Sequence, residues 1–192
     1  AFQPSKYQKA VYTYIQIGKG NAVLDAVAGS GKSTTIVNAL KLIQPDKKIL
    51  FLAFNKLIVE ELKIKIGNLP NVDICTLHSL GCKAVLKAYH SVINESKYTA
   101  WLNDRINQGM ITPTVDLTTE DRSEWKSNII QLINLGRVNL ANNVVELADL
   151  AFKHNLCIHD NECQIAISGI LWGMNNTAEV DFTDMIYLPV VK

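Results

Sequence analysis

A glycine-rich run near the N-terminus holds residue types that bind phosphate groups. It reads Ala-Val-Ala-Gly-Ser-Gly-Lys-Ser from Ala26 to Ser33. In such a loop the backbone N–H groups hold phosphate oxygens, helped by the positive end of the helix that follows. Gly29 and Gly31 allow the backbone to approach the phosphates and to adopt positive φ angles. Lys32 is predicted to reach the β- and γ-phosphates of a nucleotide, and the Ser33 hydroxyl to bind Mg²⁺.

The segments on either side of this run match the strand–loop–helix context that a phosphate-binding loop requires. An apolar, strand-like segment, Ala22 to Leu24, leads into the loop, and a helical pattern from Ser33 to Ile43 leads out of it. The strict pattern has glycine where Ala26 stands. The alternative is a Gly-Ser turn that happens to contain a lysine, but the flanking segments favour the phosphate loop. We therefore predict Lys32 and Ser33 as catalytic residues, with Ser33 binding Mg²⁺ together with the nucleotide.

Apolar strands alternate with helices from the N-terminus to about residue 90. A lead-in helix within residues 1–20, capped by Ser5, comes first. The predicted strands are Ala22–Leu24, Ile49–Phe54 and Val72–Cys75, and the predicted helices are Ser33–Ile43, Lys56–Ile66 and His78–Tyr89. This order implies an α/β fold in which helices flank a parallel sheet. A nucleotide is then expected at the carboxyl ends of the strands.

The strand signals stop near Ser91, and only helical patterns follow. The predicted helices are Ser96–Gln108, Thr119–Leu135, Val144–His154 and Asn161–Met174. We interpret them as an all-helical block inserted into the α/β chain. The predicted domains are an α/β nucleotide-binding part over residues 1–90, a helical insertion over 91–179, and a return to the α/β part over 180–192.

The composition predicts a packed protein without a global charge. Of the 192 residues 48% are hydrophobic and 19% charged, and the formal net charge is +1. Nucleic-acid binding must therefore depend on local sites. The four cysteines form no disulfide-like framework, and no apolar run approaches the roughly 18 residues that span a membrane. We expect a reducing, cytoplasmic location and no membrane contact. The abrupt beginning and end suggest a piece of a longer protein.

Four further motifs extend the pattern beyond the loop. Pro4 to Val11, which contains Gln8, resembles the glutamine motif of superfamily-one DNA helicases of the UvrD/Rep/PcrA type. The resemblance implies a RecA-like P-loop fold with ATP and Mg²⁺ as cofactors, and it implies that Gln8 reads the adenine edge. The implied cofactor-binding residues are Gln8, Ala28, Gly29, Ser30, Gly31, Lys32, Ser33 and Thr34. The alternative for Gln8 alone is a solvated helix side chain.

Two segments after the second and third strands resemble the parts of these helicases that touch DNA. Leu52 to Lys56 is most similar to the version in F-box DNA helicases and their bacterial and phage relatives, and Thr76 to Ser79 matches a Thr-x-His-Ser segment. An exposed aromatic ring stacks on bases, and a helix N-terminus holds phosphate. The implied DNA-binding residues are Phe54, Asn55, Lys56, Thr76, His78 and Ser79. Helix capping explains Asn55 equally well.

Asp181 to Ile186 resembles the Asp-Phe-x-Asp-Leu segment that closes the helical insertion in this family. A capping role explains Asp181 almost as well. The resemblance implies single-stranded or partly duplex DNA as partner, with a protein partner on the insertion possible, in a bacterial or phage-infected cell. The family's acidic Asp-Glu-x-x-Gln-Asp motif does not occur in these 192 residues. We therefore expect this chain to bind ATP and to hydrolyse it weakly.

Two other functions compete with a helicase. A small P-loop kinase of a nucleoside or metabolite fits the chain length, but the three scattered arginines form no lid that would clamp a transferring phosphoryl group. A non-catalytic nucleotide-binding interaction module also fits.

Other groups of residues in the second half of the chain are better explained by structural roles than by catalysis or ligand binding. His154, Cys157, His159 and Cys163 are zinc-ligand types, but their spacing matches no familiar zinc site, and core thiols are the alternative. The tryptophans at 101, 125 and 172 are predicted to lie in the core. The basic residues of the insertion, including Arg137, are predicted to form surface that acidic neighbours offset.

Overall fold

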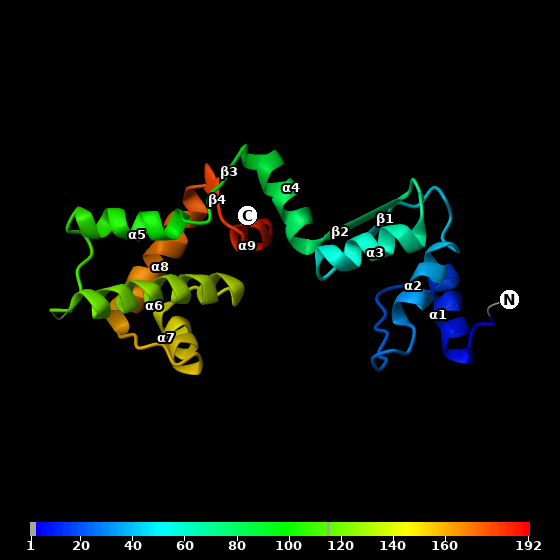
Figure 1. The fold of residues 1–192 in the computed structure, drawn as a ribbon, viewed down its shortest axis with the longest axis horizontal. Helices are drawn as coiled ribbons and strands as arrows, with labels where there is room; N and C mark the ends of the chain where they lie inside the picture. The colour runs from blue at the N-terminus through cyan, green and yellow to red at the C-terminus, as the bar shows by residue number, and fades with distance from the viewer. Residues whose placement is uncertain (1–2, 115) are drawn as a thin grey trace. The chain divides into compact units, whose positions relative to one another are not determined.

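The chain forms two compact units in the computed structural model, which describes residues 3–114 and 116–192. The first unit ends at Leu77 and the second begins at His78. In the first unit two helices, α1 (Lys6–Ile17) and α2 (Lys32–Leu40), precede the strand β1 (Ile49–Ala53). The helix α3 (Lys56–Ile66) then leads to the strand β2 (Val72–Thr76) (Figure 1).

The strands β1 and β2 pair in parallel, as the alternation of apolar strands and helices predicts. The register sets Ile49 beside Val72 and Ala53 beside Thr76. Apolar side chains of α2, α3 and β2 pack together on one face of this sheet; they are Val37, Leu40, Val59, Leu62, Ile66 and Ile74. The opposite face of β1 carries exposed leucines at 50 and 52. The first unit thus has a small core on one side of a two-stranded sheet.

The predicted strand Ala22–Leu24 is wrong in this structure. These residues adopt no strand conformation, and Val23 is 94% exposed. A strand needs hydrogen bonds from a neighbour, and the sheet that the described residues of this unit form contains only β1 and β2. Local apolar character does not supply such a neighbour. The segment therefore leads into the glycine-rich loop as irregular chain.

The second unit is mainly helical. Its elements are α4 (Leu77–Tyr89, of which Leu77 belongs to the first unit), β3 (Val92–Ile93), α5 (Lys97–Asn107), α6 (Thr119–Val138), α7 (Val144–Lys153), α8 (Asp160–Asn175), β4 (Glu179–Val180) and α9 (Asp184–Val191). The four helices predicted within the insertion match α5, α6, α7 and α8 to within three residues at each end. A short parallel pair, β3 with β4, was not predicted. Two residues are too few for an alternation of apolar and polar side chains to be recognised.

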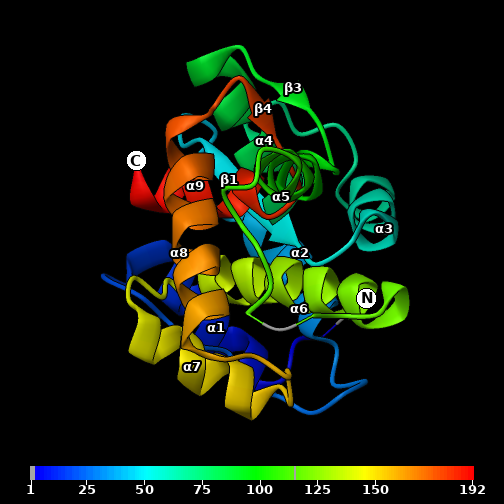
Figure 2. The same ribbon diagram turned by 90° about the vertical axis from the view of Figure 1, so that its left-hand side faces the viewer.

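The core of the second unit lies among α5, α6, α7 and α8. Helix α8 packs against both α6 and α7 and crosses α6 in the two views (Figure 1, Figure 2). Ile129, Leu132, Ile133 and Leu147 are completely buried there. Trp101 is buried as predicted, and its ring stacks on that of Trp172 with 5.8 Å between centroids. No described helix of either unit is long and apolar enough to cross a membrane.

A glycine in α4 allows this helix to lie directly against α9. A Cβ atom built on Gly81 would lie 1.8 Å from the carbonyl oxygen of Met185. We expect Gly81→Ala to lower the free energy of unfolding of the second unit by about 1–3 kcal/mol, because a backbone carbonyl cannot swing aside as a flexible side chain does. Urea denaturation followed by tryptophan fluorescence measures the change. Ala84→Ser, at an exposed position of α4, is the control. Equal stability of the Gly81 variant and the wild type would contradict this packing.

Candidate functional site

The glycine-rich loop adopts the backbone that its two glycines predict. Gly29 has a φ angle of 75° and Gly31 of 82°, in the left-handed region that other residues rarely adopt. Gly31 is the N-cap of α2, so the loop passes directly into the N-terminus of that helix. Ala28 and Ser30 are exposed in the loop, and Ser33 and Thr34 are exposed in the first turn of α2. The backbone N–H groups of the first turn of α2 therefore come directly after a glycine turn, and N–H groups at a helix start can bind an anion.

Lys32 lies across the beginning of this loop. Its Nζ donates hydrogen bonds to the carbonyl oxygens of Ala26 at 2.6 Å and of Val27 at 2.8 Å. These acceptors are neutral, whereas phosphate oxygens are charged, so a phosphate adds the attraction of an ion pair to the hydrogen bond with the lysine. The ammonium group is thus held beside the loop by contacts that an anionic ligand would outcompete.

A hollow of about 510 Å³ lies between α1 and the loop. Its volume falls within the range of small-molecule sites. Gln8, Ser30 and Lys32 line it, so three of the predicted cofactor-binding residues meet at one place. Tyr7, Asp25 and Thr35 line it as well and were not predicted. Thr35 follows the loop lysine by three residues, and no local pattern in the sequence marks it as part of the site.

Gln8 belongs to the capping structure at the start of α1. Its Oε1 accepts a hydrogen bond from the Ser5 backbone N–H at 2.9 Å, and the Ser5 hydroxyl accepts from the Gln8 backbone N–H at 3.3 Å. Ser5 is thus the N-cap, as predicted. The Gln8 Nε2 also donates to the Thr35 Oγ1 at 3.1 Å, which links α1 to α2. Gln8 is therefore not a freely solvated helix side chain.

The residues predicted to touch DNA begin where β1 and β2 end. Phe54 follows β1 directly and its side chain is 92% exposed. Asn55 caps α3, because its Oδ1 accepts from the Ile58 backbone N–H at 2.9 Å. Lys56 is exposed at the first position of that helix, and Thr76 ends β2 opposite Ala53. His78 and Ser79 lie exposed in the first turn of α4, in the second unit.

Comparison with known families decides which family the chain belongs to. The model of the UvrD/REP helicase N-terminal domain matches residues 6–191. The chain belongs to the UvrD/REP helicase N-terminal domain family. No curated protein matches the chain. Membership confirms the resemblance to UvrD-type superfamily-one helicases and implies a P-loop NTPase fold, use of ATP and Mg²⁺, and DNA binding. The closer similarity to F-box DNA helicases stays a prediction.

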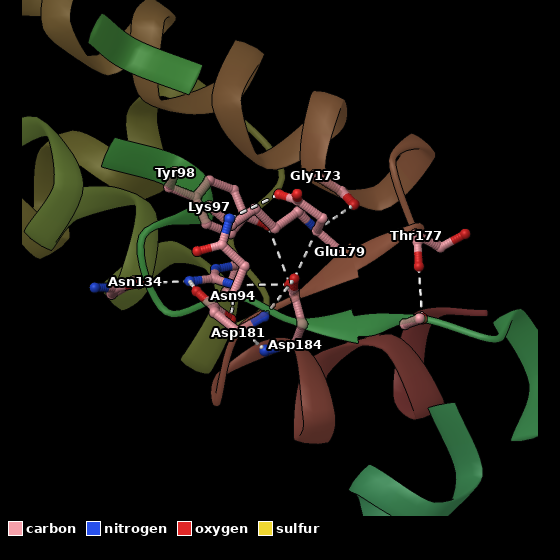
Figure 3. A network of polar contacts seen from close by, with 11 residues as sticks. Asn94, Lys97, Tyr98, Asn134, Gly173, Thr177, Glu179, Asp181 and Asp184 are labelled. Atoms are coloured by element: carbon pink, nitrogen blue, oxygen red, sulfur yellow. Dashed lines mark hydrogen bonds and ion pairs between the residues drawn. The ribbon is translucent and has the colours of Figure 1, made fainter. Parts of the chain in front are cut away.

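In this UvrD/REP-type domain the Asp-Phe-x-Asp segment is the centre of a buried ionic network. Arg137 donates from Nη1 and Nη2 to the two carboxylate oxygens of Asp181, each at 2.7 Å, and from Nη1 to the Asp184 Oδ1 at 2.7 Å. Lys97 donates to the Asp184 Oδ2 at 2.7 Å (Figure 3). The Asp181 Oδ1 also accepts from the Asp184 backbone N–H at 2.8 Å, although the N-cap position of α9 itself belongs to Thr183.

Arg137 was predicted to lie on the surface, and this prediction is wrong: it is 1% exposed. It lies on α6, 44 residues before Asp181, and only the folding of the unit brings the two together. Two cations, Lys97 and Arg137, meet two carboxylates, Asp181 and Asp184, so the buried charges balance. Such balance is what makes buried charges tolerable. The network joins α5 and α6 to the start of α9.

Protonation around this network is fixed by burial and by charge. Burial raises the pKa of the Tyr98 hydroxyl well above its usual value, although Arg137 acts in the opposite direction. Tyr98 therefore stays protonated and donates to the Asp184 Oδ1 at 3.1 Å. Burial by itself would lower the pKa of Arg137, but its hydrogen bonds to Asp181 and the neighbouring carboxylates hold that pKa above the usual value. Arg137 therefore stays charged.

The core-thiol alternative for the cysteine and histidine cluster is confirmed for Cys163 and is wrong for Cys157. Cys163 is buried in the core, whereas Cys157 is exposed, and His159 precedes α8 as its N-cap residue. Within residues 3–114 and 116–192 no three His, Cys, Asp or Glu side chains are arranged to hold a metal ion. Glu61 forms a surface ion pair with Lys65, one helical turn later on α3.

Proposed function

We propose that this chain is the ATP-binding N-terminal part of an ATP-dependent DNA helicase or translocase. The main support is that the glycine loop, Lys32 and Gln8 line one hollow. The chain also belongs to the UvrD/REP helicase N-terminal domain family. In this proposal Mg²⁺-ATP occupies the hollow. The backbone N–H groups of residues 28–34 hold the phosphates and Lys32 neutralises their charge. Ser33 carries the hydroxyl that Mg²⁺ requires, at the N-terminal turn of α2.

The domain boundaries of the sequence analysis are part of this proposal. Residues 1–90 and 180–192 then belong to the first RecA-like domain, and residues 91–179 form its helical insertion. The insertion offers a surface for DNA or for a protein partner. The 192 residues contain no Asp-Glu-x-x-Gln-Asp sequence, whose carboxylates hold Mg²⁺ and orient the attacking water in the family. We therefore propose that this polypeptide binds ATP with slow turnover. Family membership does not favour the kinase alternative.

Single-stranded DNA is proposed to bind where β1 and β2 end. The exposed ring of Phe54 offers a face on which a base stacks, and the start of α3 beside Asn55 and Lys56 suits a phosphate. Thr76 adds a hydroxyl group at the end of β2. His78 and Ser79 belong to the second unit, and their imidazole and hydroxyl groups are proposed separately as donors to phosphate oxygens. Helix capping by Asn55 does not compete with this role. The first four N–H groups of a helix have no partner within the helix, and the Asn55 side chain accepts from one of them, that of Ile58.

Phe54→Ala tests the DNA surface. We expect this variant to bind a fluorescein-labelled deoxythymidine oligonucleotide about tenfold more weakly, because each base stacked on an aromatic side chain contributes about 1–3 kcal/mol. Fluorescence anisotropy at constant salt measures the affinity. Phe152→Ala is the matched control, since Phe152 is also largely exposed but lies on α7. Equal losses in both variants, or none in either, would exclude Phe54 as a stacking platform.

A further inference from the structure

We propose, resting on the nucleotide-binding function above, that Thr35 is a specificity-determining positioning residue. Its hydroxyl fixes the orientation of the Gln8 amide, so that the site accepts adenine and disfavours guanine. Thr35 lies on α2, Gln8 lies on α1, and both line the same hollow. Thr35 is 4% exposed, so its hydroxyl must find its partners within the protein.

A chain of hydrogen bonds runs in one direction through these residues. The Gly31 carbonyl oxygen only accepts, and the Thr35 Oγ1 donates to it at 2.9 Å. Because its single proton is used there, Thr35 acts as the acceptor toward Gln8, whose Nε2 donates to it at 3.1 Å. At the other end the Ser5 backbone N–H only donates, and the Gln8 Oε1 accepts from it. Both ends therefore specify which amide atom is oxygen and which is nitrogen.

The fixed amide keeps one donor and one acceptor for a ligand. A glutamine amide has two N–H donors and two oxygen lone pairs, and Thr35 and Ser5 take one of each. The remaining N–H and lone pair match the N7 acceptor and the amino donor of adenine. Guanine presents two acceptors at the same edge, N7 and O6. An amide free to rotate could turn both N–H groups toward guanine, whereas this one cannot.

The same hydroxyl connects the base-reading side chain with the phosphate loop. Gly31, which accepts from the Thr35 hydroxyl, is the left-handed residue at which the loop passes into α2. Its carbonyl oxygen also accepts from the Thr35 backbone N–H at 2.9 Å. The orientation of Gln8 is therefore set by the backbone of the segment proposed to hold the phosphates.

Thr35→Val tests this role, because valine keeps the branched shape of threonine and replaces the hydroxyl by a methyl group, which neither donates nor accepts a hydrogen bond. Isothermal titration of the 192-residue chain with Mg²⁺-ATP and with Mg²⁺-GTP measures the two affinities. We expect the preference for ATP over GTP to fall about tenfold in Thr35→Val, the effect of one hydrogen-bond contribution. Thr35→Ser keeps the hydroxyl and is expected to retain the wild-type preference. Lys32→Ala is expected to lower the affinities for Mg²⁺-ATP and Mg²⁺-GTP by the same factor.

Three results would overturn the role of Thr35. In the first, Thr35→Val keeps the wild-type ratio of the two affinities. In the second, it loses both affinities by the same factor, which a purely structural residue would produce. In the third, Thr35→Ser loses the preference as Thr35→Val does. Each of these leaves nucleotide binding by the wild-type chain in place. Failure of the wild-type chain to bind either nucleotide would instead overturn the proposed function itself, and the role of Thr35 with it.

Discussion

Replacing Arg137 by methionine is expected to lower the free energy of unfolding of the second unit by about 3–5 kcal/mol. Methionine preserves most of the buried volume but removes the charge. Asp181 would lose both of its ion-pair contacts, and Asp184 would keep Lys97 as its single cation. The penalty arises because a carboxylate left in the interior without a cation has lost its hydration without compensation. The free energy of unfolding of Arg137→Lys is expected to lie between those of the wild type and Arg137→Met. A lysine carries the charge but cannot bind Asp181 through two nitrogens.

Tryptophan fluorescence is selective for this measurement. All three tryptophans of the chain lie in the second unit, so a denaturation curve followed at their emission reports that unit. Arg122→Met is the matched control, because Arg122 is exposed on the same helix and its loss is expected to change stability by less than about 0.5 kcal/mol. Equal effects of the two methionine variants would mean that the buried ion pairs contribute no more than a surface charge.

Replacing Lys32 by alanine is expected to weaken the binding of Mg²⁺-ATP by about a hundredfold, or about 2.7 kcal/mol. The ammonium group is held beside the loop by the carbonyl oxygens of Ala26 and Val27, which are neutral partners. A triphosphate offers charged oxygens instead, so the lysine gains on exchanging its partners. Alanine removes the ammonium group together with its two hydrogen bonds to the carbonyl oxygens of Ala26 and Val27, and it leaves Gly29 and Gly31 in place. The expected loss is larger than the loss of those two neutral contacts because the phosphate contact is an ion pair.

Lys41→Ala provides the control for charge alone. Lys41 is the exposed C-cap residue of α2, the helix that begins at Lys32. Its removal lowers the net charge equally but touches no part of the hollow. Isothermal titration of both variants with Mg²⁺-ATP compares them directly. If Lys41→Ala weakened binding as much as Lys32→Ala, the effect would be a general electrostatic one and the loop would not be the phosphate site.

The parts of this fold that depend on neighbouring residues were predictable from the sequence. Ser5, Asn55 and Thr118 each cap the helix that follows by a hydrogen bond spanning three residues, and such signals are visible in a single sequence. The glycine turn at Gly29 and Gly31 was predictable for the same reason, because a positive φ angle is a local property. These elements locate the glycine turn and the starts of the helices, but not the packing of α1 beside the loop that forms the hollow.

Features that depend on distant partners were not predictable. The segment Ala22–Leu24 has the composition of a strand, but pairing requires a neighbour that no local pattern reveals. Arginine is a residue type that usually lies on the surface. Arg137 is buried as a cation only because Asp181 and Asp184, at the start of α9, pack against it. The contact between Gln8 and Thr35 spans 27 residues, so the sequence pointed to Gln8 alone and gave no indication of the residue that orients it.

Coupling between nucleotide and DNA tests the central claim most directly. The 192-residue chain is titrated with Mg²⁺-ATP by calorimetry, alone and with a saturating single-stranded oligonucleotide, and hydrolysis is followed in the same samples. We predict binding of ATP at the loop, a changed ATP affinity when the oligonucleotide is present, and little turnover in either sample. An ATP affinity that the oligonucleotide leaves unchanged, together with steady hydrolysis by the chain alone, would contradict a helicase motor part and indicate a self-contained P-loop enzyme.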